Sequence, residues 1–157
     1  MLTTSFILEN EQETFLLGER MGQKAQPGEV WCLAGPLGAG KTLWVKGFAQ
    51  GLEFRGPVTS PTFALQHIYE GRHNLYHFDW YRLENAREVE EIGWAEWLGR
   101  GGVVVVEWGD KFPSLLPASA IKLTLEMTAE GGRRAIVEAQ HPEGMSRVEE
   151  LVRCWPP

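Results

Sequence analysis

The stretch Gly35-Pro36-Leu37-Gly38-Ala39-Gly40-Lys41-Thr42 decides how the chain is interpreted. It fits the phosphate-loop pattern G-x-x-x-x-G-K-[ST] without a gap or an insertion. Phosphate groups are bound mainly by backbone N–H groups, which can point inward where glycine leaves no Cβ in the way. In such a loop Lys41 places a positive charge against the outer phosphates, and the Thr42 hydroxyl binds the magnesium that bridges them.

The residues on either side of this loop predict the elements that it joins. Residues 29–34 form an apolar run, which is typical of a short buried strand. Val45, Phe48, Ala49 and Leu52 recur at helical spacing after the loop. The loop therefore leads from a strand to the N-terminus of a helix, where the helix dipole favours a bound anion. This context favours a nucleotide site over a Gly-rich turn that matches the pattern by chance.

Composition limits the class of protein. The 157 residues, with 43% hydrophobic side chains and seven tryptophans, predict one folded domain over residues 1–157. No apolar run approaches the ~20 residues of a membrane span, so we expect no membrane partner. The first residues lack the features of a secretory signal, and the two cysteines, Cys32 and Cys154, lie far apart in the sequence. We therefore expect reduced thiols and a cytoplasmic protein.

Charge also excludes one kind of partner. The formal net charge is −6, whereas a protein that binds a nucleic acid backbone by itself presents a basic face. The sequence gives no sign of such a face, and direct binding to nucleic acid is not expected.

The predicted elements alternate between strands and helices. A strand is expected over residues 3–9, and a helix capped by Asn10 follows to about residue 25. Alternating polarity around turn residues predicts two antiparallel hairpins. The strands of the first hairpin are expected over residues 63–69 and 74–79, and those of the second over 121–127 and 135–139. A further strand is expected over residues 103–106. Further helices are expected over residues 84–97, with a break near Gly93, and over residues 143–154. The fold class is then α/β of the P-loop NTPase kind, with a mixed parallel and antiparallel central sheet flanked by helices.

Two acidic residues end predicted strands. Glu107 follows four valines, and a buried strand that ends in a carboxylate can present it to magnesium at the carboxyl edge of the sheet. Asp79 ends the run from Leu75 in a similar way and is a candidate to hold the metal through water or to orient the attacking water. The alternatives are a surface-loop residue for Glu107 and a turn former for Asp79. The sequence does not divide the two roles between them.

The stretch Thr59-Ser60-Pro61-Thr62-Phe63 places hydroxyl groups on both sides of a proline. Such a segment can act as a switch that senses the terminal phosphate and its magnesium, and an ordinary proline turn is the alternative. Trp108, next to Glu107, is a candidate for either a functional role or core packing. His73 and His77 lie four apart on a predicted strand, which is not the spacing of metal ligands.

Taken together, the motifs resemble the TsaE family, also called YjeE, the bacterial ATPases of tRNA threonylcarbamoyladenosine synthesis. The resemblance extends from about Glu11 to the hairpin near Arg133. Its four motifs are Gly38-Ala39-Gly40-Lys41-Thr42, Ser60-Pro61-Thr62-Phe63, Tyr76-His77-Phe78-Asp79-Trp80-Tyr81-Arg82-Leu83 and Val106-Glu107-Trp108. The chain departs from the family pattern at Leu43, usually threonine, and at Trp80, commonly leucine.

The resemblance implies an activity and a set of site residues. Proteins of this family bind ATP with Mg²⁺, hydrolyse it slowly and act on a complex of TsaB and TsaD, so that tRNA is reached only indirectly. By resemblance, Thr42 and Glu107 are the magnesium ligands, and Asp79 is needed for hydrolysis together with Lys41. Residues 37–42 form the phosphate cradle behind Gly35, while Glu11 and the turn of Gly132 and Arg133 contact the nucleotide. The negative net charge agrees with a protein partner that carries the tRNA.

Two other functions remain open at this point. A small P-loop phosphotransferase would need an acceptor pocket and usually an Arg-rich lid, and the arginines here are not clustered. A nucleotide-gated binding module would use ATP to set its affinity for a partner, without any need for hydrolysis. A guanine-nucleotide enzyme is disfavoured because the Asn-Lys-x-Asp signature is missing from the sequence.

Overall fold

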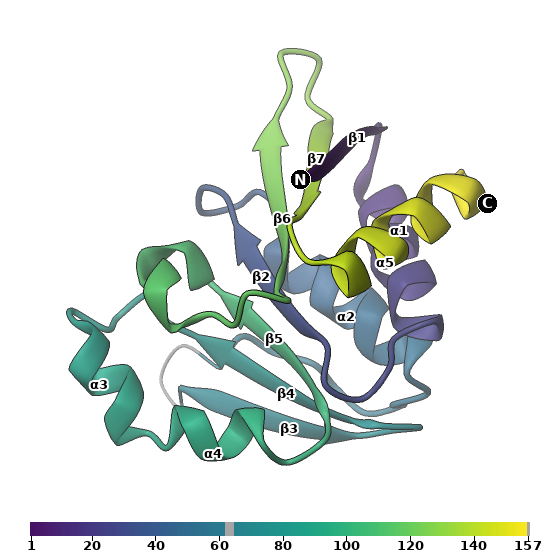
Figure 1. The fold of residues 1–157 in the computed structure, drawn as a ribbon. Coiled ribbons are helices and arrows are strands. Elements are labelled where there is room, and N and C mark those ends of the chain that lie inside the picture. The colour runs from purple at the N-terminus through teal and green to yellow at the C-terminus, as the bar shows by residue number, and fades with distance from the viewer. Residues whose placement is uncertain (62–64, 157) are drawn as a thin grey trace.

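A seven-stranded sheet forms the centre of the molecule, with the strand order β1-β7-β6-β2-β5-β4-β3 (Figure 1). The computed structural model describes residues 1–61 and 65–156. The strands are β1 (Leu2–Leu8), β2 (Val30–Ala34), β3 (Gln66–Glu70), β4 (Asn74–Asp79), β5 (Val103–Glu107), β6 (Ile121–Met127) and β7 (Arg133–Ala139). The helices are α1 (Glu11–Gln23), α2 (Lys41–Gly51), α3 (Ala86–Glu91), α4 (Trp94–Leu98) and α5 (Pro142–Cys154).

The pairing of the strands brings the predicted site residues to one edge of the sheet. Strand β2 runs parallel to β5 and β6, and β4 runs parallel to β5. The pairs β1–β7, β6–β7 and β3–β4 are antiparallel, which confirms the predicted mixed sheet. Glu107 lies opposite Leu33 on one side and opposite Asp79 on the other. The loop after β2 and the last residues of β4 and β5 therefore meet at the same carboxyl edge.

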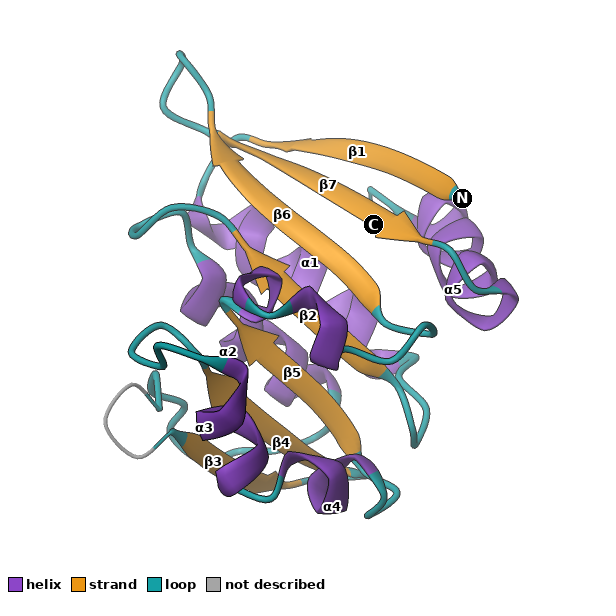
Figure 2. Cartoon of the chain, turned by 60° about the vertical axis from the view of Figure 1, so that its left-hand side comes forward, coloured by secondary structure: helices purple, strands orange, loops and turns teal. Residues whose placement is uncertain are grey.

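Helices cover both faces of the sheet (Figure 2). The larger hydrophobic core packs α1, α2 and α5 against one face, and residues such as Trp31, Trp44 and Phe48 are fully buried in it. The smaller core packs α3 and α4 against the other face, around Phe78 and Trp94. Because β2 and β5 are covered on both sides, every residue of these two strands is buried, which explains their continuous apolar sequences.

Helices α1 and α2 touch through glycines. Gly18 and Gly22 of α1 face α2, while Gly47 and Gly51 of α2 face α1, each pair separated by about one turn. A Cβ at Gly47 would overlap the carbonyl oxygen of Phe15, which belongs to the α1 backbone. The two backbones are therefore in direct contact, and α1 fixes the position of the helix that follows the phosphate loop.

Most element predictions are confirmed, and their boundaries are corrected. The side chain of Asn10 accepts a hydrogen bond from Glu13 N and caps α1, as predicted. Helix α1 ends at Gln23 rather than near residue 25, because Lys24 leaves the helical conformation. Gly93, with φ of 80°, separates α3 from α4 at the predicted break.

The strands also differ from prediction at their ends. Strand β5 runs one residue past the predicted range to include Glu107, and β7 begins at Arg133, because both residues still pair with a neighbouring strand. Strand β3 begins at Gln66. The predicted start of that strand at Phe63, and Thr62 and Phe63 of the proposed switch, lie outside the described residues. Within residues 1–61 and 65–156, no helix is long and apolar enough to cross a membrane.

Candidate nucleotide-binding site

The loop before α2 owes its shape to three glycines. Gly35, Gly38 and Gly40 have φ of 133°, 80° and 105°, a region that other residues rarely adopt. Gly35 also lies against the carbonyl oxygen of Leu125 in β6, where no Cβ would fit. Gly40 immediately precedes α2 and has no side chain to cap the first N–H groups of that helix. The start of α2 therefore has the geometry of an anion site.

Lys41 is folded back onto the loop that it follows. Its Nζ donates to the carbonyl oxygens of Gly35 at 2.6 Å and Pro36 at 2.9 Å, and lies 4.3 Å from the centre of the Trp108 ring. Burial lowers the pKa of Lys41, and the negative charges of Glu107 and Asp79 act in the opposite direction. The ammonium group is thus held among weak neutral acceptors and an aromatic face, next to two carboxylates.

Glu107 faces the first turn of α2. The Thr42 hydroxyl lies 3.0 Å from Glu107 Oε1 and 3.3 Å from Oε2, and the hydroxyl donates because the carboxylate can only accept. His77 Nε2 lies 2.6 Å from Oε2. Glu107 is buried as the last residue of β5, so the alternative of a surface-loop residue is wrong.

Asp79 is buried beside Glu107 at the end of β4. The Ser60 hydroxyl donates to Asp79 Oδ2 at 2.9 Å, and Tyr81 N donates to Oδ1 at 2.8 Å. The bond from Tyr81 N is the local turn contact that a strand-end aspartate can make. Asp79 therefore forms a turn and, at the same time, lies opposite Glu107 in the β4–β5 register.

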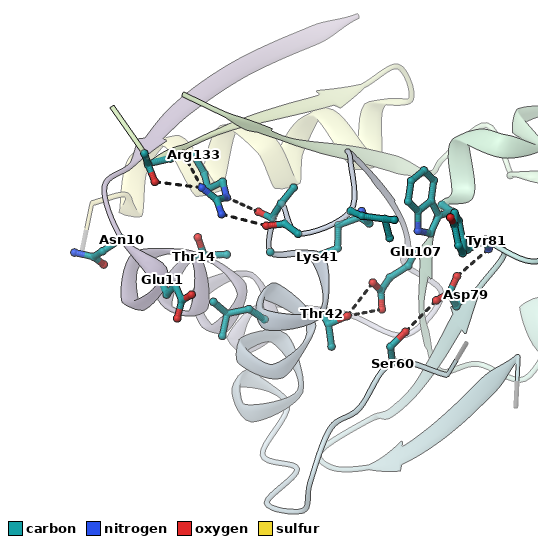
Figure 3. A pocket seen from close by; sticks show the side chains of 18 residues that line it. Asn10, Glu11, Thr14, Lys41, Thr42, Ser60, Asp79, Tyr81, Glu107 and Arg133 are labelled. Carbon is teal, nitrogen blue, oxygen red and sulfur yellow. Dashed lines mark hydrogen bonds between the residues drawn. The ribbon is translucent and has the colours of Figure 1, made fainter. Parts of the chain in front are cut away.

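A cavity of about 710 Å³ collects most of the predicted site residues (Figure 3). Its lining residues come from six parts of the chain: Asn10, Glu11, Thr14, Leu37, Gly38, Ala39, Gly40, Lys41, Thr42, Leu43, Ser60, Asp79, Tyr81, Glu107, Trp108, Gly131, Gly132 and Arg133. Gly35 does not line the cavity, but its carbonyl oxygen holds Lys41. Glu11 and Gly132, which lie far from the loop in the sequence, are brought to the same cavity.

Arg133 joins the last hairpin to the phosphate loop. Its Nε donates to Ala39 O at 2.9 Å, and its Nη2 donates to Gly38 O at 3.1 Å. Nη1 donates to the carbonyl oxygens of Gly131 and Gly132. A single planar guanidinium therefore bridges two backbone segments, and it fixes the loop as well as lining the cavity.

Sequence reasoning missed several neighbours of the cavity. Asn10 and Thr14 line it beside Glu11, and the sequence carries no signal for this because α1 reaches the loop only through tertiary packing. Tyr81 stacks on Trp108, with ring centres 4.9 Å apart. His77 is fully buried against Glu107, and one signal was present: it lies two residues before Asp79 on a strand and therefore shares its face.

Comparisons with known proteins show the family of the chain. The family model described as threonylcarbamoyl adenosine biosynthesis protein TsaE matches residues 8–136. The TsaE protein of Treponema pallidum (strain Nichols) is 41% identical over 126 residues, which cover 80% of this chain and 93% of the relative. The TsaE protein of Bacillus subtilis (strain 168) is 36% identical over 145 residues, which cover 92% of this chain and 90% of the relative.

A solved structure is similar over nearly the whole chain. The crystal structure of Bacillus subtilis YdiB superposes with a TM-score of 0.85 at 30% sequence identity, and the match covers 97% of this chain and 95% of that one. Fold, motif order and sequence similarity lead to one conclusion. The chain belongs to the TsaE family of tRNA threonylcarbamoyladenosine biosynthesis proteins.

Proposed function

We propose that this chain is a magnesium-dependent ATPase that supports tRNA threonylcarbamoyladenosine modification by acting on the TsaB–TsaD pair in the cytoplasm. The observation that carries the ATPase proposal is the contact between Thr42 and Glu107. It places a hydroxyl from the start of α2 and a carboxylate from the end of β5 side by side, next to Lys41.

The cavity suits a nucleotide in size and chemistry. Its volume of about 710 Å³ lies within the range of roughly 300–1,000 Å³ that is usual for small-molecule sites. The uncapped start of α2 offers N–H donors, and Lys41 offers a cation. The ammonium group of Lys41 donates to two neutral oxygens, Gly35 O and Pro36 O. Phosphate oxygens are charged and would form stronger hydrogen bonds with it.

The residues around Glu107 also fit magnesium. This hard cation prefers oxygen ligands and is commonly held by one or two carboxylates together with phosphate oxygens and water. Thr42 and Glu107, whose oxygens lie 3.0 Å apart, would supply two oxygen ligands from the protein. Bound there, the ion would neutralise charge on the phosphate oxygens. Asp79 lies opposite Glu107 and accepts hydrogen bonds from Ser60 and Tyr81 N, and we expect it to orient water for hydrolysis.

A protein partner fits the charge of the chain better than tRNA does. With a net charge of −6, this chain should have no measurable affinity for tRNA at physiological salt, because Lys and Arg contacts to phosphates supply most non-specific binding. Residues 59–61 contact the site through Ser60 and Asp79. We expect this segment to respond to the terminal phosphate and to bind the partner more tightly with ATP than with ADP.

The first experiment tests the nucleotide site. Labelled ATP is titrated against the wild type, Lys41→Ala and the control Lys46→Ala, which removes an exposed lysine from the same helix. We expect Lys41→Ala, and not the control, to lose useful binding, because the phosphates lose the counter-charge that Lys41 supplies at the start of α2. An affinity of Lys41→Ala within about threefold of wild type would contradict a phosphate-binding role, since a charge-assisted contact contributes more than that.

The second experiment separates turnover from gating. ATP hydrolysis is measured with and without the TsaB–TsaD pair, and calorimetry compares partner affinity with ADP and with a non-hydrolysable ATP analogue. Stimulated hydrolysis and tighter binding with the analogue support the proposal. A hydrolysis-deficient variant that still supports repeated rounds of tRNA modification would instead make the chain a nucleotide-gated binding module. Transfer of the terminal phosphate to a metabolite would make it a phosphotransferase.

A further inference from the structure

A chain of hydrogen bonds, buried near Glu107, leads from the back of that residue to the surface. His77 of β4 places Nε2 2.6 Å from Glu107 Oε2, and its Nδ1 lies 3.2 Å from the hydroxyl of Tyr69 on β3. The Tyr69 hydroxyl lies 3.0 Å from the carbonyl oxygen of Thr59. This series of hydrogen bonds thus connects Glu107, the candidate metal ligand, with Thr59, the residue immediately before Ser60.

The chemistry of these groups fixes most of the donors and acceptors. A carboxylate only accepts, so His77 Nε2 carries a proton and donates to Glu107. In a neutral imidazole, Nδ1 is then an acceptor that the Tyr69 hydroxyl can reach. Burial raises the pKa of Tyr69 to about 12, so the hydroxyl keeps its proton at neutral pH. That single proton can be donated to His77 Nδ1 or to Thr59 O, and these two acceptors compete for it. His67 Nδ1 also lies at this junction, 3.2 Å from the Tyr69 hydroxyl and 3.3 Å from Thr59 O.

Burial strengthens the two contacts of His77. Its side chain is fully buried and Tyr69 is 5% exposed, so water screens the contacts of His77 with Glu107 and Tyr69 little, whereas the contact of Tyr69 with the exposed Thr59 is part-buried. A hydrogen bond also changes the strength of the next one in a chain. When Nε2 donates to a free carboxylate, the ring becomes richer in electrons and Nδ1 becomes a better acceptor. When the carboxylate gives an oxygen to a cation, Nδ1 becomes a weaker acceptor, and the Tyr69 proton is directed to Thr59.

The adjacent residues Thr59 and Ser60 are therefore connected to Glu107 and Asp79 by different hydrogen bonds. Thr59 reaches Glu107 through Tyr69 and His77, and Ser60 reaches Asp79 directly at 2.9 Å. Glu107 and Asp79 lie opposite each other in the sheet. The segment formed by residues 59–61 is thus attached to both sides of the candidate metal site.

We propose that His77 and Tyr69 are positioning residues that hold Glu107 toward Thr42 and transmit metal binding at Glu107 to the backbone of Thr59. This inference rests on the proposed magnesium role of Glu107. His77 sets the affinity for the metal, and Tyr69 couples that binding to the order of residues 59–61. Neither side chain is among the residues that line the cavity.

The first test measures metal affinity with Mn²⁺ and ADP, using the loss of the free-ion EPR signal. His77→Asn keeps an amide near the Nδ1 position and removes the group that meets Glu107, whereas His77→Gln places an amide near the Nε2 position. We expect the Mn²⁺ dissociation constant of His77→Asn to rise about tenfold, as for other residues that orient metal ligands. ADP affinity without metal should stay within about twofold, and His77→Gln should recover most of the metal affinity.

The second test follows hydrogen exchange in peptides that contain Thr59 and Ser60, with and without Mn²⁺ and ADP. In the wild type, we expect metal and nucleotide together to slow this exchange. Tyr69→Phe should lose most of that additional protection. The control Tyr76→Phe alters a buried tyrosine of β4 that packs on Trp97 in the other core, and it should keep the protection. Thermal unfolding establishes that each variant is folded.

The outcomes separate the inference from the function on which it rests. Wild-type metal affinity in His77→Asn, or wild-type protection in Tyr69→Phe, would overturn the positioning chain while leaving the ATPase proposal intact. If Mn²⁺ bound to the wild-type complex with ADP no more tightly than to ADP alone, the metal role of Glu107 would fail, and the inference with it. A selective loss of metal affinity in His77→Asn, with recovery in His77→Gln, is a result that general damage to the core would not produce.

Discussion

Replacing Gly47 by alanine tests whether contact between helix backbones holds the phosphate loop in place. A Cβ at this position would overlap Phe15 O, lie 2.9 Å from Phe15 C and lie 3.0 Å from Glu19 N. All three atoms belong to the backbone of α1, so no side chain can rotate away. The Phe15 C contact falls 0.5 Å short of the 3.4 Å at which ordinary contact begins, and the helices must separate by more than this because the oxygen is closer still.

The expected cost follows from two opposing effects. Overpacking of this kind costs about 1–3 kcal/mol, and a rigid backbone neighbour favours the upper end. Alanine has a better helix propensity than glycine, which returns up to about 1 kcal/mol. We therefore expect Gly47→Ala to lower the free energy of unfolding by about 2 kcal/mol and the midpoint of thermal unfolding by roughly 4–8 °C.

The assay is urea unfolding followed by the fluorescence of buried tryptophans such as Trp44, which packs in the same core. Lys46→Ala is the control, because it places alanine on the exposed face of the same helix and should change stability by less than about 0.5 kcal/mol. A Gly47→Ala protein as stable as the wild type would refute the argument, since it would mean that α1 and α2 can separate at no cost.

Three further predictions concern single residues. Glu107→Gln should bind ATP but hydrolyse it about tenfold more slowly at limiting Mg²⁺, because an amide is a weaker ligand for this ion; an unchanged rate would assign the metal role to Asp79. Arg133→Lys should weaken nucleotide binding about tenfold in calorimetry, because an ammonium cannot bridge the two loop carbonyls as the planar guanidinium does; equal affinity would show that the bridge is dispensable. Burial raises the pKa of Cys32 to about 12, so at pH 8 its thiol stays protonated and a disulfide reagent should label Cys154 first; rapid labelling of both would contradict that burial.

The local pattern of apolar residues was sufficient to predict the strands that lead directly into the site. The apolar run before Gly35 predicted β2, and the valines before Glu107 predicted β5. Asp79 and Glu107 were each predicted to end a strand, and the parallel pairing of β4 with β5 in the structure places them opposite each other at one edge of the sheet. The predicted hairpins were also confirmed, since each depends on a short turn between neighbouring strands.

Long-range pairing accounts for what sequence reasoning missed. Nothing in residues 2–8 indicates that this strand pairs with residues 133–139, and that pairing sets the strand order at one edge of the sheet. The position of Arg133 over the phosphate loop depends on that order as well. His77 was assigned no role because its partner Glu107 is 30 residues away in the sequence, and only the parallel pairing of β4 with β5 brings them together.

The strand order also determines when the site can form during synthesis. Strand β1 is made before the other strands that the structure describes, but its partner β7 is made after them. Until β6 emerges, the edge of β2 next to the phosphate loop has no partner, and the loop lacks Arg133. Non-local pairing of this kind is slow, because a long loop must close before any contact is gained. A growing chain that already contains the complete phosphate-loop motif therefore has no finished cavity, and a nucleotide bound there as proposed could stabilise the protein only after Arg133 has been made.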